Sequence, residues 1–328
     1  MDRIGVPLVV ITSELPGDAL SLLEGRARVK TFKSRGGPRT EGEVLRCLGR
    51  ATGAVTLLTD PITETVLEAC PNLRVVSNCA VGVDNIDLRA CARRGVTVTN
   101  TPGVLTEATA GLTWALILAA ARRVVEGDRL MRAGRFKGWL PTFHLGMDLR
   151  GKTLGVVGMG RIGRAVVRRA PAFGMRVAYT DPKRLTESVE AALAATWLPL
   201  AELVANAHVL TLHCPLTPET RHLLDARRLA SMRPGSILIN TGRGPIVDEV
   251  ALVESLRSGH LAAAGLDVYE HEPLMSPGLR DLPNTVLLPH IGSASRETRE
   301  EMARMAVANC LAVLEGRPPS NPVEPSVP

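Results

Sequence analysis

Short apolar runs alternate with longer mixed stretches along nearly the whole chain. The runs consist largely of Val, Ile, Leu and Ala and show little alternation between apolar and polar positions. Such runs are typical of strands that are buried on both faces, as in a parallel sheet covered by helices. The repeated strand–helix order predicts an α/β fold with two Rossmann-like, doubly wound domains and parallel sheets. The expected strands are residues 8–12, 54–58, 73–78, 96–100, 153–158, 175–181, 208–214, 235–242, 263–269 and 285–290.

A long helical segment separates the first four expected strands from the last six. It should run from about Leu105 to Met131, and a last helix should run from Arg296 to about Leu314, before an irregular proline-rich tail. The most apolar part, residues 108–121, is bounded by charged residues and is too short to span a bilayer. We therefore expect a buried core helix and no membrane association.

The composition is that of an ordinary globular protein. Hydrophobic residues make up 45% and charged residues 22% of the 328 positions, a balance that excludes a disordered chain. The formal net charge of +6 is compatible with nucleic-acid binding, but the basic residues are scattered among 33 acidic ones. We expect a small anionic substrate and no nucleic acid.

The six cysteines contain no C-x-x-C pair and no repeated spacing. This pattern predicts free thiols in a reducing cytosol, with no disulfide scaffold and no metal site. The first apolar run, IGVPLVVI, is short and is soon followed by acidic residues, unlike a signal peptide. We expect a cytoplasmic protein.

The strongest local motif is G-x-G-x-x-G, formed by Gly158, Gly160 and Gly163. An apolar strand precedes it, and a helix-like stretch and a second strand follow it. In this context the first glycine permits a tight turn, the second lets the backbone approach a pyrophosphate, and the third allows close packing of helix and strand. The motif predicts a dinucleotide site, although a tight turn without a ligand would need the same glycines.

The strand after the glycine motif ends at Asp181. A carboxylate at this distance accepts hydrogen bonds from the adenosine ribose hydroxyls and repels a 2′-phosphate, which favours NAD. Lys183 and Arg184 favour NADP instead, because they could hold that phosphate. The residues alone leave the choice between NAD and NADP open, with NAD slightly favoured by Asp181.

Three other predicted strands end in polar residues, and ligands of open α/β sheets bind at that edge. The residues that follow these strands are Thr241, Gly242 and Arg243, then Asp267 and Glu272, and finally His290. Taken alone, Arg243 is better explained as a surface arginine, Glu272 as a loop carboxylate and His290 as a strand cap. Together with a dinucleotide site, they have the chemical groups that an active site would need.

This set fits the reduction of a 2-oxo acid. Hydride transfer to a ketone requires a proton for the developing alkoxide, and histidine suits that task because its ordinary pKa lies near neutrality. A carboxylate on the other ring nitrogen fixes the tautomer and favours the protonated ring. A guanidinium can hold the substrate carboxylate and polarise its carbonyl.

A fourth strand leads into a turn of small residues at Gly82. Exposed backbone N–H groups in such a turn could bind a carboxylate. An ordinary strand–helix turn capped by Asp84 or Asn85 would give the same pattern, and the residues alone do not decide between the two.

Several long motifs, taken in order, resemble the D-isomer-specific 2-hydroxyacid dehydrogenases. They are VGVDNIDL, TPGVLTEATA, GMGRIG, HCPLTPETRHLL, NTGRGPIVDE, GLDVYEHEP and LPHIGSAS. The resemblance runs from about Ala54 to the final helix. It implies two Rossmann-like domains with a cleft between them: a discontinuous substrate domain of residues 1–100 with 291–328, and a dinucleotide domain of residues 101–290. It also implies a homodimer formed largely through the nucleotide domain, and we expect hinges near Asn100 and Pro289.

The resemblance also implies residue roles. His290 would donate the proton in reduction, Glu272 would be its partner, and Arg243 would bind the substrate. The backbone at Val81 and Gly82 would hold the substrate carboxylate. The expected cofactor contacts are Thr106, Gly158, Gly160, Arg161, Ile162, Gly163, Asp181, Pro182, Lys183, Arg184, Cys214, Pro215, Thr241, Gly242, Arg243, Asp267, His290 and Gly292, with Asp267 near the nicotinamide.

Within this family the motif LLTDPI, the motif TPGVLTEATA and the chain length are most similar to glyoxylate and hydroxypyruvate reductases. The expected reaction is reduction of glyoxylate or hydroxypyruvate by NAD(P)H, giving glycolate or D-glycerate. Many members of this branch have a basic residue in place of Asp181 and use NADP.

Two alternatives stay open. One is a D-lactate-type or bulkier 2-hydroxyacid dehydrogenase, which would differ around Leu57, Leu58 and Trp139. Trp139 is expected either in a substrate pocket or as a buried aromatic. The other alternative is a dinucleotide-sensing corepressor-like protein.

Overall fold

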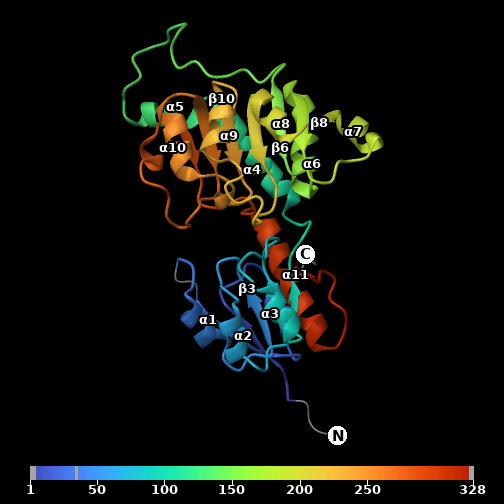
Figure 1. Ribbon diagram of the computed structural model, residues 1–328. Coiled ribbons are helices and arrows are strands. Elements are labelled where there is room, and N and C mark those ends of the chain that lie inside the picture. Colours follow the sequence, from blue (N-terminus) through green and yellow to red (C-terminus); the bar gives the residue numbers. More distant parts are fainter. Residues whose placement is uncertain (1–4, 34–35, 325–328) are drawn as a thin grey trace. The chain divides into compact units, whose positions relative to one another are not determined.

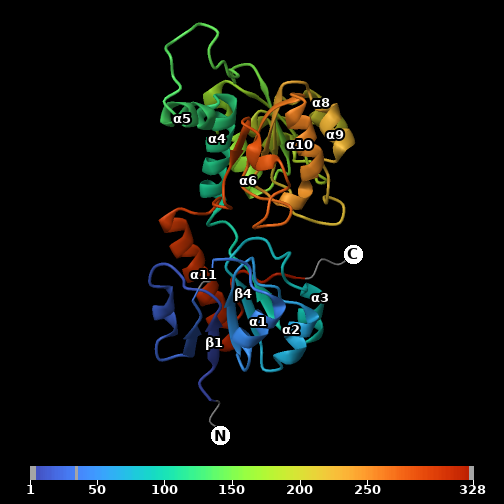
Figure 2. The same ribbon diagram turned by 90° about the vertical axis from the view of Figure 1, so that its left-hand side faces the viewer.

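The computed structural model describes residues 5–33 and 36–324. The chain forms two compact units: a terminal unit, Met1–Leu105 with Ser293–Pro328, and a central unit, Thr106–Gly292. These units resemble the predicted domains, residues 1–100 with 291–328 and residues 101–290, with boundaries that lie beside Leu105 and Gly292. Figures 1 and 2 show both units, each with a sheet between helices.

The terminal unit contains a five-stranded parallel sheet in the order β2-β1-β3-β4-β5. Its strands are β1 (Leu8–Ile11), β2 (Arg28–Thr31), β3 (Gly53–Thr56), β4 (Val75–Asn78) and β5 (Thr97–Thr99). One apolar core lies under the helices α1 (Glu41–Leu48), α2 (Glu64–Ala69) and α3 (Leu88–Arg93). A second core lies under the 3-10 helix η1 (Ala19–Leu23) and the long helix α11 (Arg296–Leu314). The sheet is thus covered on both faces.

The last helix packs tightly on this sheet because β3 begins with a glycine. A Cβ on Gly53 would lie 2.8 Å from the Sγ of Cys310 in α11. Segments that are far apart in sequence therefore share one core, and the expected helix from Arg296 to Leu314 is confirmed.

The central unit contains a seven-stranded parallel sheet in the order β12-β11-β10-β9-β6-β7-β8. The chain reverses its direction of progress between the neighbouring strands β6 and β9, the topological switch point where Rossmann folds bind dinucleotides. The strands are β6 (Thr153–Val157), β7 (Arg176–Thr180), β8 (Ala195–Trp197), β9 (Val209–Leu212), β10 (Ser236–Asn240), β11 (Leu261–Leu266) and β12 (Thr285–Leu287).

Helices cover both faces of this second sheet. One face carries α4 (Thr106–Ala121), α6 (Arg161–Val167) and η2 (Ala170–Phe173) over a large apolar core. The other face carries α8 (Leu200–Asn206), α9 (Ala226–Ser231) and α10 (Glu249–Arg257). The remaining elements are α5 (Val124–Arg132), α7 (Glu187–Leu193), η3 (Gly244–Ile246) and η4 (Leu279–Asp281). The predicted fold class, two doubly wound α/β sheets, is confirmed.

Two strands were not predicted, and both lie at sheet edges. β2 has the sequence RVKT, and all four of its residues are exposed. β8 has three residues, of which Ala195 alone is buried. β2 and β8 bury little apolar surface, so their sequences lack the apolar run from which the other ten strands, including the better buried edge strands β5 and β12, were recognised.

The predicted helix from Leu105 to Met131 is wrong in the middle, because α4 and α5 are separate helices bent by 64° at their junction. Arg123 has a left-handed φ of 54°. The Ala121 carbonyl accepts a hydrogen bond from Met147 N at 2.7 Å, and the Arg123 carbonyl lies 3.0 Å from His144 Nε2. Met147 in the loop thus takes up the Ala121 carbonyl, which a continuing helix would have used, whereas the Arg123 carbonyl also accepts from Gly127 N in α5 at 3.0 Å.

Helix α4 is a core helix of the central unit, as expected: the side chains of Trp114, Leu116 and Ile117 are buried. Among the described residues no single helix is long and apolar enough to cross a bilayer. Of the helices described, only α4 and α5 counted together, as a bent pair, have the length and the apolar composition of a membrane span. All six cysteines are free thiols.

Candidate active site

The glycine turn after β6 is shaped by two close backbone approaches. Gly158 has a φ of 93°, and a Cβ there would lie 2.5 Å from Cys214 N, just after β9. A Cβ on Gly163 would lie 2.2 Å from the Gly158 carbonyl oxygen. A Cβ on Gly160, in contrast, would meet nothing within 4 Å. The turn therefore leaves open backbone at the switch point, which fits the approach of a pyrophosphate.

Asp181, just past β7, is fixed against this turn. One carboxylate oxygen accepts from Met159 N at 2.8 Å and the other from Lys183 N at 3.0 Å. Lys183 and Pro182 are exposed. The Arg184 guanidinium is engaged with Glu190, through Nε to Oε1 at 2.9 Å and Nη2 to Oε2 at 3.0 Å.

The loop after β10 is held by its own asparagine. Asn240 Oδ1 accepts from Gly242 N at 3.0 Å, and its Nδ2 donates to the Arg243 carbonyl at 2.9 Å. The hydroxyl of Thr241 lies 3.0 Å from that of Thr113 in α4. Arg243 Nη1 donates to the Gly242 carbonyl at 2.9 Å. These contacts fix the loop on which Arg243 stands, and Asn240 was not among the residues expected at the site.

Asp267 follows β11 and is almost fully buried, at 1% exposure. Its two oxygens accept from Ile291 N and Gly292 N, each at 2.7 Å. Burial raises the pKa of this carboxyl, while the hydrogen bond from Ile291 N lowers it. Asp267 thus ties the end of β11 to the segment that follows His290.

His290 and Glu272 form a hydrogen-bonded pair. His290 Nδ1 lies 2.8 Å from Glu272 Oε2, and both side chains are partly exposed. A carboxylate can only accept, so Nδ1 carries the hydrogen. No hydrogen bond to His290 Nε2 is recorded within the described ranges. The ring therefore presents Nε2 as its second proton-carrying atom.

The chain around this pair is tightly organised. His290 has a left-handed φ of 54°. Tyr269 N donates to Glu272 Oε1 at 3.1 Å, and its hydroxyl donates to the Leu288 carbonyl at 2.9 Å. Tyr269 thereby connects the segment of Glu272 to that of His290.

Glu249, at the start of α10, supports the same segment and was not recognised from the sequence. It is buried, and its two oxygens accept from Glu270 N at 2.5 Å and Ser276 N at 2.9 Å. These two amides flank Glu272 in the chain. Glu249 follows Asp248, the N-cap of α10, so its position in the motif GPIVDE was the only local signal.

The remaining expected cofactor contacts also lie in the central unit. Cys214 and Pro215 follow β9, and burial raises the pKa of the Cys214 thiol to about 11. Arg161 and Ile162 begin α6. Thr106 begins α4, and Thr109 of that helix donates to the Gly292 carbonyl at 3.2 Å. The structure brings the strand ends of β6, β9, β10, β11 and β12 to one edge of one sheet.

Val81 and Gly82 lie in the terminal unit, in the turn after β4. The Ala80 carbonyl accepts from Thr101 N at 2.9 Å, and the Val81 carbonyl accepts from Asn100 Nδ2 at 2.8 Å. In a trans peptide the N–H points opposite to the carbonyl, so the N–H groups of Val81 and Gly82 point away from the Asn100–Thr101 segment. No partner for either N–H is recorded in the part of the chain that the structure describes. The turn thus offers two backbone donors.

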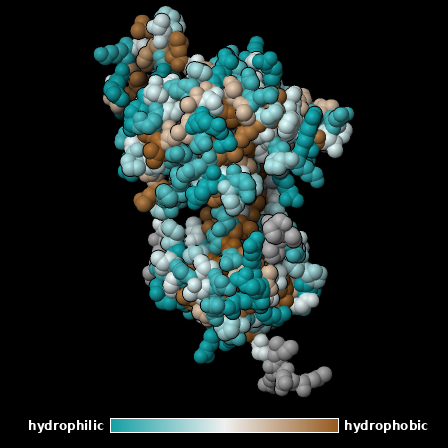
Figure 3. Space-filling view, viewed as in Figure 1, coloured by the Kyte–Doolittle hydropathy of each residue, from teal (hydrophilic) through white to brown (hydrophobic). Residues whose placement is uncertain are grey.

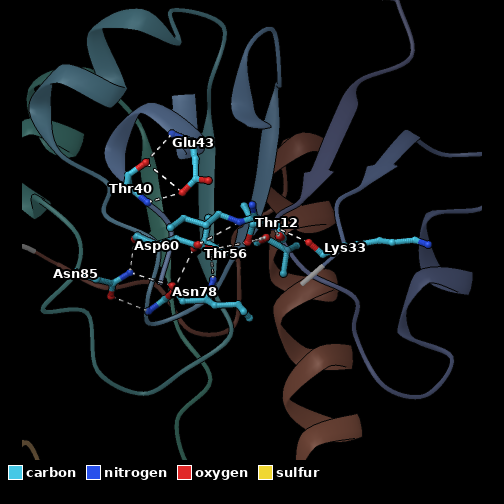
Figure 4. A network of polar contacts seen from close by, with 11 residues as sticks. Thr12, Lys33, Thr40, Glu43, Thr56, Asp60, Asn78 and Asn85 are labelled. Atoms are coloured by element: carbon cyan, nitrogen blue, oxygen red, sulfur yellow. Dashed lines mark hydrogen bonds and ion pairs between the residues drawn. The ribbon is translucent and has the colours of Figure 1, made fainter. Parts of the chain in front are cut away.

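A polar network lies beside this turn (Figure 4). Asn78 Nδ2 donates to the Gly82 carbonyl at 2.9 Å and to Asn85 Oδ1 at 3.3 Å. Asn85 Nδ2 donates to the Asp60 carbonyl at 2.8 Å, and the buried Asp60 carboxylate accepts from Thr12 Oγ1 at 2.5 Å. Neither Asp84 nor Asn85, the two expected helix caps, caps the following helix. Helix α3 is capped by Asp87, whose carboxylate accepts from Ala90 N at 2.8 Å.

One of the two expectations for Trp139, a buried aromatic side chain, is wrong. It is 80% exposed, so it is not a buried aromatic. It stands in the irregular segment after α5, together with other exposed apolar side chains (Figure 3, upper left). Leu57 and Leu58 are half-buried in the terminal unit.

Comparison with known proteins gives one consistent result. The family model described as D-isomer specific 2-hydroxyacid dehydrogenase, NAD binding domain, matches residues 114–292. The chain is 46% identical over 323 residues to the glyoxylate reductase of Korarchaeum cryptofilum, covering 98% of this chain and 97% of that protein. It is 48% identical to the glyoxylate reductase of Aeropyrum pernix, covering 98% and 97%.

Solved structures agree. A protein of Thermus thermophilus with 51% identity superposes with a TM-score of 0.89, covering 96% of this chain and 99% of that one. An NADPH-dependent glyoxylate/hydroxypyruvate reductase of Sinorhizobium meliloti, solved with NADP and malonate, has 33% identity and a TM-score of 0.86, covering 97% of both chains.

Proposed function

The chain belongs to the D-isomer-specific 2-hydroxyacid dehydrogenase family and is an NAD(P)-dependent oxidoreductase, and we propose that it reduces glyoxylate or hydroxypyruvate to glycolate or D-glycerate. The observation that carries this proposal is the pair of His290 Nδ1 and Glu272 Oε2 at 2.8 Å, at the sheet edge that also carries the glycine turn. The relatives named glyoxylate reductase support the choice of small 2-oxo acids.

His290 is the proton donor in this proposal. Glu272 binds Nδ1, so Nε2 is the atom that protonates the developing alkoxide oxygen. Glu272 also stabilises the imidazolium before transfer, because a carboxylate partner favours the charged ring. The nicotinamide, when bound, supplies the hydride to the carbonyl carbon.

Arg243 and the turn of the terminal unit bind the substrate in this proposal. The guanidinium suits a carboxylate because it presents paired N–H donors in one plane. The two backbone N–H groups of Val81 and Gly82 suit the same carboxylate, since the carbonyls of the same two peptide groups, those of Ala80 and Val81, are held on the opposite side by Thr101 N and Asn100 Nδ2.

The nucleotide is held, we propose, along the strand ends of the central unit. Backbone at the glycine turn approaches the pyrophosphate, and Asp181 accepts from the adenosine ribose hydroxyls. NADH is the preferred coenzyme because the Asp181 carboxylate would repel a 2′-phosphate. The further lining residues are Thr106, Arg161, Ile162, Pro182, Lys183, Cys214, Pro215, Thr241, Gly242, Asp267 and Gly292.

We also propose a cytoplasmic homodimer. The segment after α5 exposes several large apolar side chains, including Leu140, Leu145 and Trp139. A contiguous apolar segment of this kind is typical of a surface that another protein covers. A second copy of the chain is the partner that the family resemblance predicts.

The proposed reaction is tested by the absorbance of the reduced nicotinamide, using NADH or NADPH with glyoxylate, hydroxypyruvate, pyruvate and a bulkier 2-oxo acid. Rapid loss with glyoxylate or hydroxypyruvate is the expected result. Turnover confined to the bulkier acid would support the D-lactate-type alternative. No turnover of any acid, together with capture of a stoichiometric protein partner, would support the corepressor-like alternative.

A further inference from the structure

We propose that Glu190 helps set the coenzyme preference by holding Arg184 away from the place where the 2′-phosphate of NADP would bind. The inference rests on the proposed function, because it concerns the same nucleotide site. It adds a residue, Glu190, that no sequence motif marked.

The loop after β7 carries both signs of charge. Asp181 is the acid, and Lys183 and Arg184 follow it within three residues. In Rossmann folds this loop meets the adenosine ribose, where an acid selects NAD and an arginine can accommodate the 2′-phosphate of NADP. The preference therefore depends on whether the basic side chains are available to a phosphate.

The Arg184 guanidinium has two partners: its N–H groups bind Glu190, and its plane lies near the Trp197 ring. Its Nε and Nη2 bind the two carboxylate oxygens of Glu190 at 2.9 and 3.0 Å, the bidentate geometry that is strongest for this pair of groups. Its guanidinium carbon lies 5.8 Å from the centroid of the Trp197 ring. Trp197 in turn donates from Nε1 to the Asp181 carbonyl at 3.4 Å. Arg184 thus lies beside the ribose loop while its Nε and Nη2 donate to Glu190 in α7.

Glu190 is itself held in place from the core. Tyr179, which is fully buried, donates from its hydroxyl to Glu190 Oε1 at 2.8 Å, and that hydroxyl accepts from Leu185 N at 2.9 Å. The hydrogen bond from Arg184, and then the one from Tyr179, lowers the pKa of the Glu190 carboxyl. The carboxylate therefore stays charged at neutral pH and remains oriented toward Arg184.

A 2′-phosphate at this site would face two obstacles. It would lie near the Asp181 carboxylate, and it would have to compete with Glu190 for the Arg184 guanidinium. Removing the charge of Glu190 should release Arg184 and improve binding of the 2′-phosphate without changing the contacts of the glycine turn. That consequence separates the role of Glu190 from a purely structural one.

The test is calorimetric binding of two probes to the full-length protein, 5′-AMP and adenosine 2′,5′-bisphosphate, at neutral pH and one ionic strength. Glu190→Gln should raise the affinity for the bisphosphate relative to 5′-AMP by about tenfold, the gain of one charge-assisted contact. Glu190→Ala provides a second variant without the amide. The kcat/KM ratio of NADPH to NADH should move in the same direction.

Two controls define the mechanism. Glu187→Gln removes a neighbouring acid on the same helix that does not bind Arg184, and should leave the ratio within about twofold. Arg184→Ala in the Glu190→Gln background should abolish the gain. An unchanged ratio in both Glu190 variants, an equal gain in Glu187→Gln, or a gain that survives Arg184→Ala would overturn the inference. Failure of the wild type to bind 5′-AMP would overturn the proposed nucleotide site itself, so the two failures are distinguishable.

Discussion

Glu272 binds two partners at once, His290 Nδ1 through one oxygen and Tyr269 N through the other. Its negative charge, rather than its hydrogen bond alone, stabilises the protonated imidazole in the proposed reaction. Glu272→Gln should therefore lower kcat by roughly ten- to a hundredfold, within the range that general acid catalysis contributes. The KM for glyoxylate should change little.

The matched control for this change is Glu270→Gln. Glu270 lies two residues away but pairs with His222, whose Nε2 is 2.6 Å from its Oε1. Steady-state kinetics of both variants should show a fall in kcat for Glu272→Gln alone. Equal effects of the two substitutions would mean that the segment, and not the Glu272 charge, controls the rate.

His213 gives a prediction about acid stability. Burial lowers its pKa to about 3, and its Nδ1 is buried without a hydrogen-bond partner among the described residues. The unfolded chain binds a proton near pH 6.5 and the folded chain does not, so stability is lost as pH falls from about 6.5 toward 3. The loss from this one group is at most about 1.4 kcal/mol per pH unit.

His213→Asn should flatten that dependence. Urea midpoints measured at several pH values between neutrality and about pH 4 should fall less steeply in the variant than in the wild type. His271→Asn, at an exposed histidine, is the control and should follow the wild type. Parallel curves for His213→Asn and wild type would contradict the assigned burial.

Single residues differ in how far the sequence could identify them. His290, Asp267 and Arg243 stand just past apolar runs, so the sheet edge could be inferred from local pattern. Glu249 and Glu190 act through partners that the fold brings near: Glu249 binds amides 21 and 27 positions away. No spacing rule connects such positions, so these supporting residues could not be predicted.

At the scale of elements, the β6–α6 turn gives a paired prediction. A Cβ at Gly163 would collide with backbone 2.2 Å away, whereas a Cβ at Gly160 would meet nothing within 4 Å. Gly163→Ala should destabilise the central unit by about 1–3 kcal/mol, as overpacking does. Gly160→Ala should leave the unfolding transition unchanged and raise the KM for NADH.

Thermal unfolding and nucleotide titration of both variants check this pair. A large drop in the melting temperature for Gly160→Ala, or unchanged stability for Gly163→Ala, would show that the turn has a different shape. The strands were predicted wherever most of their residues are buried, the edge strands β5 and β12 included. The edge strands β2 and β8 were not predicted, because most of their residues are exposed to solvent. The break between α4 and α5 was not predicted either, because contacts with a distant loop accompany it and the apolar pattern does not.

At the scale of the whole molecule, the exposed apolar segment after α5 predicts a dimer. Sedimentation should give twice the mass of the chain, and Leu145→Ser combined with Trp139→Ser should shift the population toward the monomer, since each removes apolar contact area. Val250→Ser, at an exposed apolar residue on α10, is the control. A monomeric wild type would contradict the proposed homodimer. The hinges near Asn100 and Pro289 stay predictions.

The most direct test of the proposed activity is the rate of NADH absorbance loss with glyoxylate, compared between wild type and His290→Asn at neutral pH. We expect rapid turnover by the wild type and a fall in kcat of about 10²–10⁴-fold in the variant, with nucleotide binding retained. Turnover by His290→Asn within a few-fold of wild type would contradict the assignment of His290 as the proton donor, and with it the central chemical claim.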